Sequence, residues 1–539
     1  MLKDWIKAVS LGLLAFGVIC FVTIARDPSF RGMSRDGGAF AYCGQKIASG
    51  GLLYRDCWDN KPPAIYYVNA AVIAIGGPTQ WNLWLAQAIW LAITAVAFYI
   101  ILSKIWGGSV AFLCTALMLL SLLHPTFWEG GNLTETYALL PIVLTLGAYG
   151  GYIKTNKRFY LIGIGLFTAI SFLFKPTYIS VGLAAGLILT YLSIRQRQFR
   201  RLMVEWGLIL GSFIVPLILV AAYWAAHNEL YDLMYAVLIH NQQYVQAGFT
   251  KKAFFVTLRI FVLEQPLAAL TILALISMIA WAVESWNVFR HPHDPQIGEV
   301  DEERVRFWFM VGLVVAVCLD VFFTGLSGRN FHHYFQIPML TLAASSAYLF
   351  FTLAQLRRTT PRGGPYAIIA ISAVFVILLP WAVEVYGKEV PSRGNLAFFL
   401  SHPNVTRYQP EAIEKVILEH SQPDQSIFIW GYDPAIYFHV GRRSPSRYIF
   451  PQHLFTPTPN GPNGFAEFFI ELERDPPVLI LSSKGSEQGL AYLGIEEQDI
   501  CLECPADIRQ GVIALKRYVT QYYLPYMDSQ DWAVYTRIK

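Results

Sequence analysis

The sequence predicts an α-helical polytopic membrane protein with a soluble α/β domain at its C-terminal end. The first observation is composition: of 539 residues, 55% are hydrophobic and 14% are charged, with a mean hydropathy of +0.42. This is too apolar for a soluble globular protein of this length. The second is patterning, because the apolar residues gather in runs of roughly twenty, enough for a helix to cross a hydrocarbon core about 30 Å thick. The third is a change to shorter hydrophobic runs after residue 387.

Each long apolar run predicts one membrane-spanning helix, which gives about eleven spans. The first run has Lys3 and Lys7 near its start and no small-residue cleavage site after it, so residues 2–25 are expected to be an uncleaved signal anchor. The runs cover residues 7–25, 83–103, 108–124, 134–153, 158–174, 176–194, 205–226, 266–286, 307–325, 334–352 and 365–384.

The basic residues of the short loops predict the orientation. They fall in alternate loops, for example at Lys104, at Lys154, at 195–201 and at 357–362, while the intervening loops carry almost no Lys or Arg. Short cytoplasmic loops collect positive charge. We therefore expect the N-terminus and the basic loops in the cytoplasm, and residues 27–82 and the C-terminal domain on the outer side.

One further apolar run, residues 62–77, is short for a span. It begins at a double proline and contains Tyr66, Tyr67 and Asn69, so we expect a helix that lies in the membrane interface within the first outer loop. Counting it as a span would reverse every later loop and place the basic cluster at 195–201 outside, against the charge rule.

The chain is expected to divide into a transmembrane domain, residues 1–387, and an outer domain, residues 388–539. In the second part, hydrophobic runs of strand length at 426–430, 478–481 and 533–537 alternate with helical patterns. The helical patterns cover 410–420 and 465–474. Such alternation is typical of an α/β domain.

Polar residues of the outer connections indicate where chemistry takes place. The first outer loop is dense in charge and holds a rigid corner at residues 61–63, and the later outer connections carry acids, cations and aromatic residues. All would collect at one membrane face, where lipid head groups meet water. Lys175 stands alone between two spans on the side where basic residues are rare, so it suits a lipid phosphate. The candidates are Asp36, Tyr54, Arg55, Asp56, Asp59, Lys61, Glu129, Glu135, Lys175, His240, Tyr244, Arg329, His332, His333 and Tyr334.

Other kinds of site are less well supported. The sequence has no G-x-x-x-x-G-K-[ST] loop, and its net charge of +4 does not suggest a nucleic-acid partner. Cys501 and Cys504 have CxxC spacing without a second pair, which supports a zinc site only weakly. They could instead form a disulfide, as could Cys43 with Cys57, in an oxidising compartment. Asp320 lies inside a predicted span and raises a transporter or lipid flippase as an alternative.

A motif in the first outer loop carries a family resemblance. It comprises Asp36, residues 41–45 (AYCGQ), Gly50, 54–56 (YRD), 58–63 (WDNKPP) and 66–67 (YY), with further matches at 175–176, 333–338, 430–432 and 478–480. In these residues the chain resembles the bacterial multi-span glycosyltransferases of the C class (GT-C). That family includes the protein O-mannosyltransferases (glycosyltransferase family 39) and the lipid A aminoarabinose transferases.

The resemblance implies an inverting hexosyl or pentosyl transferase of the bacterial inner (plasma) membrane. Its donor would be a polyprenyl-phosphate sugar, and its acceptor a hydroxyl of a lipid, glycan or protein at the periplasmic or extracellular face. The family places the catalytic base at Asp36 and a phosphate-binding lysine at Lys61. Lys175, Arg55 and Arg329 are further expected phosphate-binding cations. The expected substrate-binding residues are Tyr54, Asp56, Asp59, Glu135, His333 and Tyr334.

The chain departs from the family pattern at Gly37, where many relatives have a second acid. This argues against a paired-acid metal site, and no cofactor is expected to be required. A divalent metal held by Asp36 with Glu129 or Glu135 stays open, as does a polysaccharide polymerase or ligase that uses a lipid-diphosphate oligosaccharide.

Overall fold

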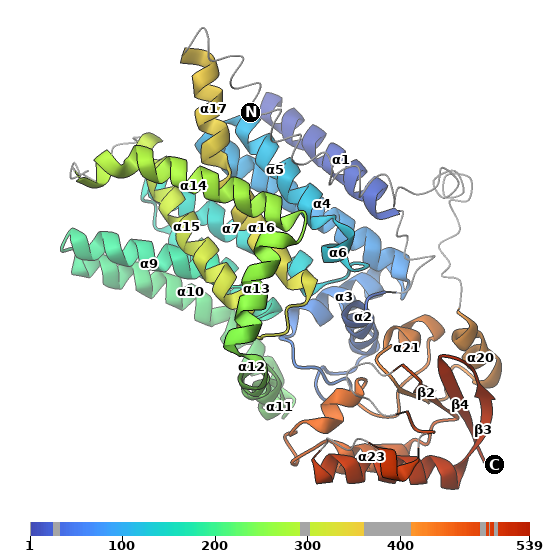
Figure 1. Cartoon of the computed structure of the whole chain (residues 1–539). Coiled ribbons are helices and arrows are strands. Elements are labelled where there is room, and N and C mark those ends of the chain that lie inside the picture. The colour runs from blue at the N-terminus through green and yellow to red at the C-terminus, as the bar shows by residue number, and fades with distance from the viewer. Residues whose placement is uncertain are drawn as a thin grey trace.

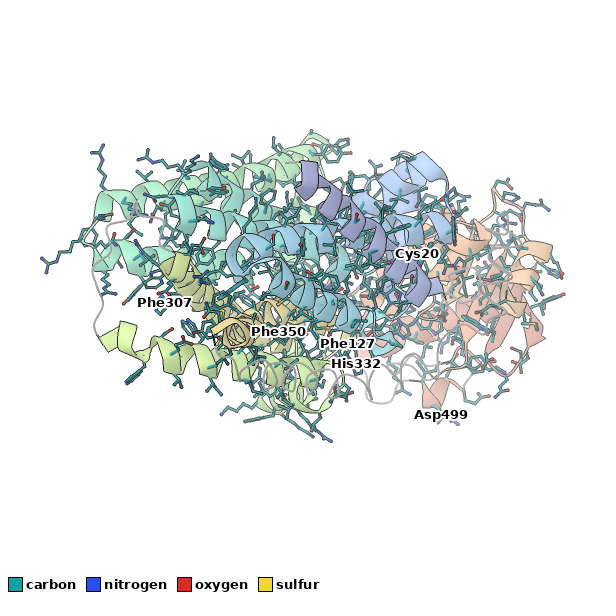
Figure 2. All side chains as sticks on the ribbon, turned by 90° about the horizontal axis from the view of Figure 1, so that it is seen from above. Cys20, Phe127, Phe307, His332, Phe350 and Asp499 are labelled. Carbon is teal, nitrogen blue, oxygen red and sulfur yellow. A yellow bond between two sulfur atoms is a disulfide. The ribbon has the colours of Figure 1, made fainter. Side chains whose placement is uncertain are left out.

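The computed structural model describes residues 2–24, 33–290, 302–359, 411–485, 492–494, 496–500 and 505–538. A bundle of helices forms most of the molecule, and a small domain packs against one end of it (Figure 1). Viewed from above, this domain, which carries Asp499, lies beyond that end of the bundle (Figure 2). The bundle contains α1 (Leu2–Ile24), α2 (Arg35–Ala48), α3 (Ala64–Gly76), α4 (Gln80–Trp106), α5 (Gly108–Leu122), α6 (Pro125–Trp128), α7 (Thr134–Thr155), α8 (Phe159–Phe174), α9 (Ser180–Arg195), α10 (Phe199–Ala226), α11 (Leu230–Met234), η1 (Tyr235–His240), α12 (Asn241–Gly248), α13 (Lys251–Leu263), α14 (Leu267–Arg290), α15 (Glu302–Gly325), η2 (His332–Phe335), α16 (Gln336–Ser345) and α17 (Ala347–Thr359).

The helices confirm a polytopic membrane protein. Every predicted span from 7–25 to 334–352 coincides with a helix, although the last is divided at Ser346 into α16 and α17. The expected span at 365–384, and with it the count of eleven, lies outside the described residues. Within the part that the structure describes, six stretches are long and apolar enough to cross a membrane, namely Gln80–Trp106, Thr134–Thr155, Phe199–Ala226, Leu267–Trp286, Glu302–Gly325 and His332–Leu356. Shorter apolar helices, including the run expected to lie in the interface (Ala64–Gly76), accompany them.

The outer surface of the bundle is apolar where lipid would cover it. Only 11% of the apolar stretch of α10 is buried inside the protein, and Ile218 and Leu219 are exposed. A helix keeps all its backbone hydrogen bonds within itself, so such a surface is stable against hydrocarbon although not against water.

Helix α2 positions the start of the first outer loop. The Oγ of Ser34 caps it by accepting a hydrogen bond of 3.1 Å from the backbone N–H of Gly37, and Asp36 in the first turn is favourably placed at the positive end of the helix dipole. A Cβ on Gly37 would lie 2.8 Å from that Oγ and 3.0 Å from the carbonyl oxygen of Gly131. The absence of a second acid after Asp36 therefore has a steric reason.

A disulfide between Cys43 and Cys57 ties α2 to the loop that follows it, with a Cα–Cα distance of 5.5 Å. This pair is one of the two that the sequence left open. The other pair, Cys501 and Cys504, lies outside the described residues.

The C-terminal domain is built on a four-stranded mixed sheet of order β1-β2-β4-β3. Strands β1 and β2 are parallel, and the remaining neighbours are antiparallel. The predicted strands and helices all form, while β3, α21 and α23 are additional; the boundary expected at residue 387 is not among the described residues. The elements are α20 (Ala412–His420), β1 (Ile427–Trp430), α21 (Ala435–Val440), η3 (Pro451–Phe455), α22 (Phe465–Arg474), β2 (Leu479–Ser483), η5 (Glu497–Asp499), α23 (Ala506–Tyr522), β3 (Tyr523–Asp528) and β4 (Trp532–Arg537).

The domain docks on the first outer loop through backbone and buried side chains. Gly38 allows α2 to approach α21 closely, because a Cβ there would lie 2.5 Å from that of Ala435. The backbone N–H of Trp58 donates to the carbonyl oxygen of Arg447 at 2.9 Å. The Arg447 guanidinium in turn donates to Tyr54 O at 3.0 Å and pairs with Asp232 at 3.0 Å and Glu467 at 2.8 Å. These contacts hold the domain as a fixed wall over the loop.

Candidate active site

A cavity of about 1100 Å³ lies between the bundle and the C-terminal domain. Its walls come from the first outer loop, the α8–α9 connection, α12, the end of α15, η2 and η3. It contains most of the polar residues predicted from the outer connections. Of the predicted candidates, it is lined by Asp36, Asp59, Lys61, Lys175, His240, Tyr244, Arg329 and Tyr334.

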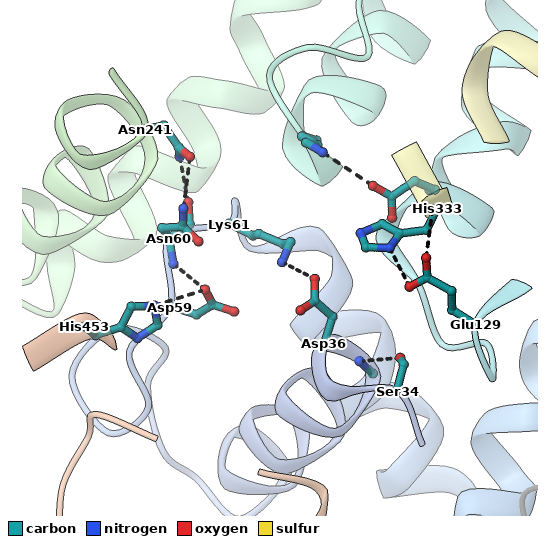
Figure 3. A network of polar contacts seen from close by, with 12 residues as sticks. Ser34, Asp36, Asp59, Asn60, Lys61, Glu129, Asn241, His333 and His453 are labelled. Carbon is teal, nitrogen blue, oxygen red and sulfur yellow. Dashed lines mark hydrogen bonds and ion pairs between the residues drawn. The ribbon is translucent and has the colours of Figure 1, made fainter. Parts of the chain in front are cut away.

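Asp36 and Lys61 form an ion pair at the centre of the polar part of the cavity (Figure 3). The Nζ of Lys61 donates to Oδ2 of Asp36 at 2.9 Å and also lies 4.7 Å from the centre of the Phe40 ring. Burial favours the neutral acid, but the charges of Lys61 and His333 outweigh it and hold the pKa of Asp36 well below its usual range. Burial opposes the charge on Lys61 too, yet Asp36 and Asp59 raise its pKa above the usual value. Both groups therefore stay charged at neutral pH.

Lys175 lies in the α8–α9 connection, as predicted, and points into the cavity from its other side. Its Nζ is 3.5 Å from Oε1 of Glu135 and 3.2 Å from the centre of the Tyr334 ring. Glu135, in the first turn of α7, also accepts a hydrogen bond from the hydroxyl of Tyr178. Burial lowers the pKa of Lys175 to about 8, although Glu135 acts in the opposite direction. Lys175 is thus a cation that can lose its charge under mildly alkaline conditions.

His333 and Glu129 form a third polar pair next to Asp36 (Figure 3). The Nδ1 of His333 is 2.7 Å from Oε2 of Glu129, and its backbone N–H donates to Oε1 at 3.1 Å. Glu129 adopts a left-handed conformation (φ 46°) at the end of α6, which turns the carboxylate towards η2. Neither residue lines the cavity, and the charge of His333 contributes to the low pKa of Asp36.

Two of the predicted phosphate-binding cations have different surroundings. The guanidinium of Arg329 lines the cavity and lies 5.2 Å from the centre of the Tyr244 ring. Arg55 does not line it: its exposed side chain pairs with Asp56 at 2.7 Å, and Asp56 accepts from the Leu52 N–H at 2.6 Å. The proposed roles of Arg55 and Asp56 at the substrate are therefore not supported, because their charges are used within the loop.

Tyr54 supports the site without reaching it. Its side chain is buried, and its hydroxyl donates to the carbonyl oxygen of Lys61 at 2.8 Å. With the Lys61-Pro62-Pro63 corner, this hydrogen bond fixes the backbone from which the Lys61 side chain extends.

The C-terminal domain contributes residues to the cavity that were not predicted from the sequence. His453, at η3, lines the cavity with Phe450 and Phe455, and its Nε2 is 3.9 Å from Oδ1 of Asp59. Arg35 was also missed; it lines the cavity beside Asp36, with its guanidinium 4.8 Å from the centre of the Tyr432 ring. Its position next to Asp36 was the one available sequence signal, whereas His453 had none.

The carboxylates named for a divalent metal are each paired with a basic group of the protein. Asp36 pairs with Lys61, Glu129 with His333 and Glu135 with Lys175, so each carboxylate has a basic partner from the protein. Within the described ranges, no group of three or more His, Cys, Asp or Glu side chains is arranged to hold a metal ion.

Asp320, the acid inside α15, lines the cavity and accepts a hydrogen bond of 2.6 Å from Thr341 of α16. Such a local partner accounts for its burial without a transported ion.

Part of the chain matches a known protein family. Residues 60–224 match the model of the dolichyl-phosphate-mannose-protein mannosyltransferase family. This match includes Lys61, Glu135 and Lys175, and it confirms the resemblance to the multi-span glycosyltransferases of the C class. Among curated proteins, none matches the chain.

Solved structures share the fold over nearly the whole length. ArnT from Cupriavidus metallidurans bound to undecaprenyl phosphate superimposes with a TM-score of 0.57 at 14% identity, covering 100% of this chain and 99% of ArnT. The apo state of ArnT from the same organism superimposes with a TM-score of 0.52 at 15% identity, covering 99% of this chain and 98% of ArnT. The apo oligosaccharyltransferase of Archaeoglobus fulgidus gives 0.50 at 12% identity, covering 97% of this chain and 80% of that chain. These TM-scores and coverages show a shared fold, which includes both the helical bundle and the C-terminal domain.

Proposed function

We propose that the protein is an inverting glycosyltransferase that moves a sugar from a polyprenyl-phosphate donor to a hydroxyl acceptor. The observation that carries the proposal is the arrangement of the cavity: the Asp36 carboxylate lies among the cations Lys61, Lys175 and Arg329, and apolar side chains continue the cavity into the bundle. The family match and the ArnT-like fold point the same way, since that ArnT structure is bound to undecaprenyl phosphate.

The cations suit the phosphate of the donor. Lys61, Lys175 and Arg329 come from three separate connections and converge on one cavity. Fixed positive charges at a site that is largely shielded from water stabilise the charge that develops on a leaving phosphate. The lipid tail would extend along Phe172, Phe323 and Ile337, which line the part of the cavity formed by α8, α15 and α16.

Asp36 suits the general base. It removes the proton of the acceptor hydroxyl while the acceptor oxygen bonds to the anomeric carbon and the bond from that carbon to the phosphate oxygen breaks. Polyprenyl phosphate leaves, and the configuration at the anomeric carbon inverts. Donor phosphate also draws the Lys61 ammonium away from Asp36, which weakens the pair and makes the carboxylate a stronger base.

The face on which this takes place is the non-cytoplasmic one. Basic residues of the alternate loops meet at the end of the bundle away from the cavity, where Lys154 donates to the carbonyl oxygen of Lys104 at 3.4 Å and Arg201 donates to Asn156 at 2.9 Å. The positive-inside rule assigns that end to the cytoplasm. The Cys43–Cys57 disulfide suits an oxidising compartment such as the bacterial periplasm for the cavity.

Transfer assays with Asp36→Asn test the proposal. This substitution keeps the shape of the side chain and removes the base, so we expect turnover to fall by about 100-fold or more while undecaprenyl phosphate still binds. The matched control is Asp56→Asn, a loop aspartate outside the cavity. Full activity of Asp36→Asn would overturn the assignment, and a lipid diphosphate as the only productive donor would favour a polymerase or ligase.

A further inference from the structure

One wall of the cavity has no part in the mechanism above. It is formed by Asp59 of the first outer loop, His240 of η1 and His453 of η3, and it is the place where the C-terminal domain meets the site. Figure 3 shows Asp59 and His453 on the opposite side of Lys61 and Asp36 from His333 and Glu129. We refer to these three residues as the histidine wall.

The histidine wall contains hydrogen-bonding capacity that the protein does not use. All three side chains are buried, with relative exposures of 3% for Asp59, 5% for His240 and 3% for His453. Across the described part of the chain, no hydrogen-bond partner is found for Nδ1 of His240 or Nδ1 of His453. Leaving a polar group unpaired in a buried site costs about 1–3 kcal/mol. Such a cost is typical of groups that wait for a ligand or for water.

The two histidines of the histidine wall, His240 and His453, are uncharged at neutral pH. Burial lowers the pKa of His240 to about 4, and burial together with the nearby His240 holds the pKa of His453 well below its usual range. Neutral imidazoles each offer one hydrogen-bond donor and one acceptor. This suits a ligand with several hydroxyl groups rather than a second phosphate.

Aromatic rings surround the wall. The Trp58 ring lies 4.6 Å from that of His453 and 5.1 Å from that of His240, centre to centre, and Phe450 lies 5.5 Å from His453. Phe450, Phe455 and Tyr432 line the same end of the cavity. A few fixed polar groups set among aromatic side chains are typical of a small-molecule site.

We propose that the histidine wall is a binding site for a sugar ring, whose hydroxyl groups hydrogen-bond to His240, His453 and Asp59. The inference rests on the proposed function, because the lipid tail and phosphate occupy the other end of the cavity. The ring is either the glycosyl group of the donor or a sugar of the acceptor. In both cases the C-terminal domain takes part in sugar recognition through His453.

The test measures binding to the purified full-length protein in lipid nanodiscs. The probes are undecaprenyl phosphate and the same lipid carrying mannose, glucose or arabinose on its phosphate. The variants are His453→Ala, His453→Gln, which retains size and hydrogen bonding, and His240→Ala. The matched control is His420→Ala, an exposed histidine of the same domain that contacts Val416 and lies outside the cavity.

If the wall holds the glycosyl group of the donor, His453→Ala weakens binding of the glycosylated lipid about 5- to 10-fold and leaves that of undecaprenyl phosphate within about twofold. If the wall holds a sugar of the acceptor, donor binding is unchanged and the KM for the acceptor rises by the same factor. His453→Gln retains more affinity than His453→Ala in either case, which a mere packing role would not produce.

Two results would overturn the inference. One is that both alanine variants bind every probe and turn over within twofold of wild type; the other is that they lose glycosylated and bare lipid equally. If the wild-type protein binds none of the lipid probes, the proposed function fails and this inference fails with it. The two failures are thus distinguishable by the wild-type measurement.

Discussion

The helical bundle holds an acid paired with a cation at each of its two ends, and the surroundings of the two pairs differ. At the end away from the cavity, Glu205 accepts hydrogen bonds from Tyr152 at 2.6 Å, Ser193 at 2.8 Å and Arg201 at 2.7 Å. At the other end, the Lys61 ammonium donates a hydrogen bond to Asp36, and the pair lies on the wall of a cavity. The first arrangement is complete within the protein and serves stability. In the second, the charges of Lys61 and Asp36 face a cavity and can interact with a ligand, as is typical of a binding site.

The largest expected effect comes from removing one cation at each end. Lys61→Ala should lower kcat/KM for transfer by about 100-fold or more, because the developing phosphate charge loses a fixed cation. It should lower the melting temperature less than Arg201→Ala does, because the Asp36 side chain is 28% exposed and water can replace the ammonium, whereas Glu205 is 2% exposed. Arg201→Ala should do the reverse: it leaves Glu205 short of a partner and costs about 2 kcal/mol of stability, while activity below the melting temperature is retained. Transfer assays and thermal unfolding are measured for both variants. Equal losses of activity in the two variants would contradict the assignment of one pair to function and the other to stability.

The pH dependence separates Lys175 from Lys61. Lys175 has a pKa of about 8, so it loses its charge as the pH rises through that value, whereas the pKa of Lys61 is raised. We expect kcat/KM for the donor to fall above pH 8, by about tenfold. Lys175→Arg keeps the charge at alkaline pH and should remove this decline. A decline that persists in Lys175→Arg would assign it to another group.

Tyr334 should have an intermediate effect through its ring. Lys175 lies 3.2 Å from the ring centre, and a cation–π contact of this kind contributes about 0.5–2 kcal/mol. Tyr334→Leu should therefore weaken donor binding by about 2- to 30-fold, and Tyr334→Phe should stay close to wild type. The measurement is the affinity of each variant for undecaprenyl phosphate. Equal losses in Phe and Leu would assign the effect to the hydroxyl instead.

The Cys43–Cys57 disulfide should stabilise the end of the bundle that carries the cavity, and not the end that carries Glu205. Replacing Cys43 and Cys57 together by Ser removes a cross-link between residues 14 apart in sequence, which costs about 3 kcal/mol on the loop-closure estimate. The expected result is a melting temperature lower by several degrees. Reduction of the wild-type protein should reproduce this shift and leave the double variant unchanged.

The smallest expected effect is that of Arg55→Ala. Arg55 is exposed, pairs with its neighbour Asp56 and does not line the cavity, so activity should stay within about twofold of wild type. A loss as large as that of Lys61→Ala would mean that the loop rearranges when the donor binds.

The sequence was sufficient to predict the membrane spans, the basic loops and the motif that contains Asp36 and Lys61. Each of these features depends on residues that are close together in the chain. Hydrophobic length fixes a membrane helix whatever its neighbours are, and Lys175 stood out as a lone cation in a short connection. Arg55 looked equivalent to Lys61 in sequence, yet the two point to different places, and only the fold of the loop separates them. His453 could not be predicted as a site residue. It is 394 positions after Asp59 in the chain (453 minus 59), and no motif around it indicates a binding role.

The contact of Trp58 with Arg447 and Tyr448 joins the first ninth of the polypeptide to its last fifth. A ribosome must therefore finish most of the chain before the cavity is enclosed. A partly synthesised chain that already contains Asp36 and Lys61 still lacks the wall of the cavity that Phe450 and His453 provide.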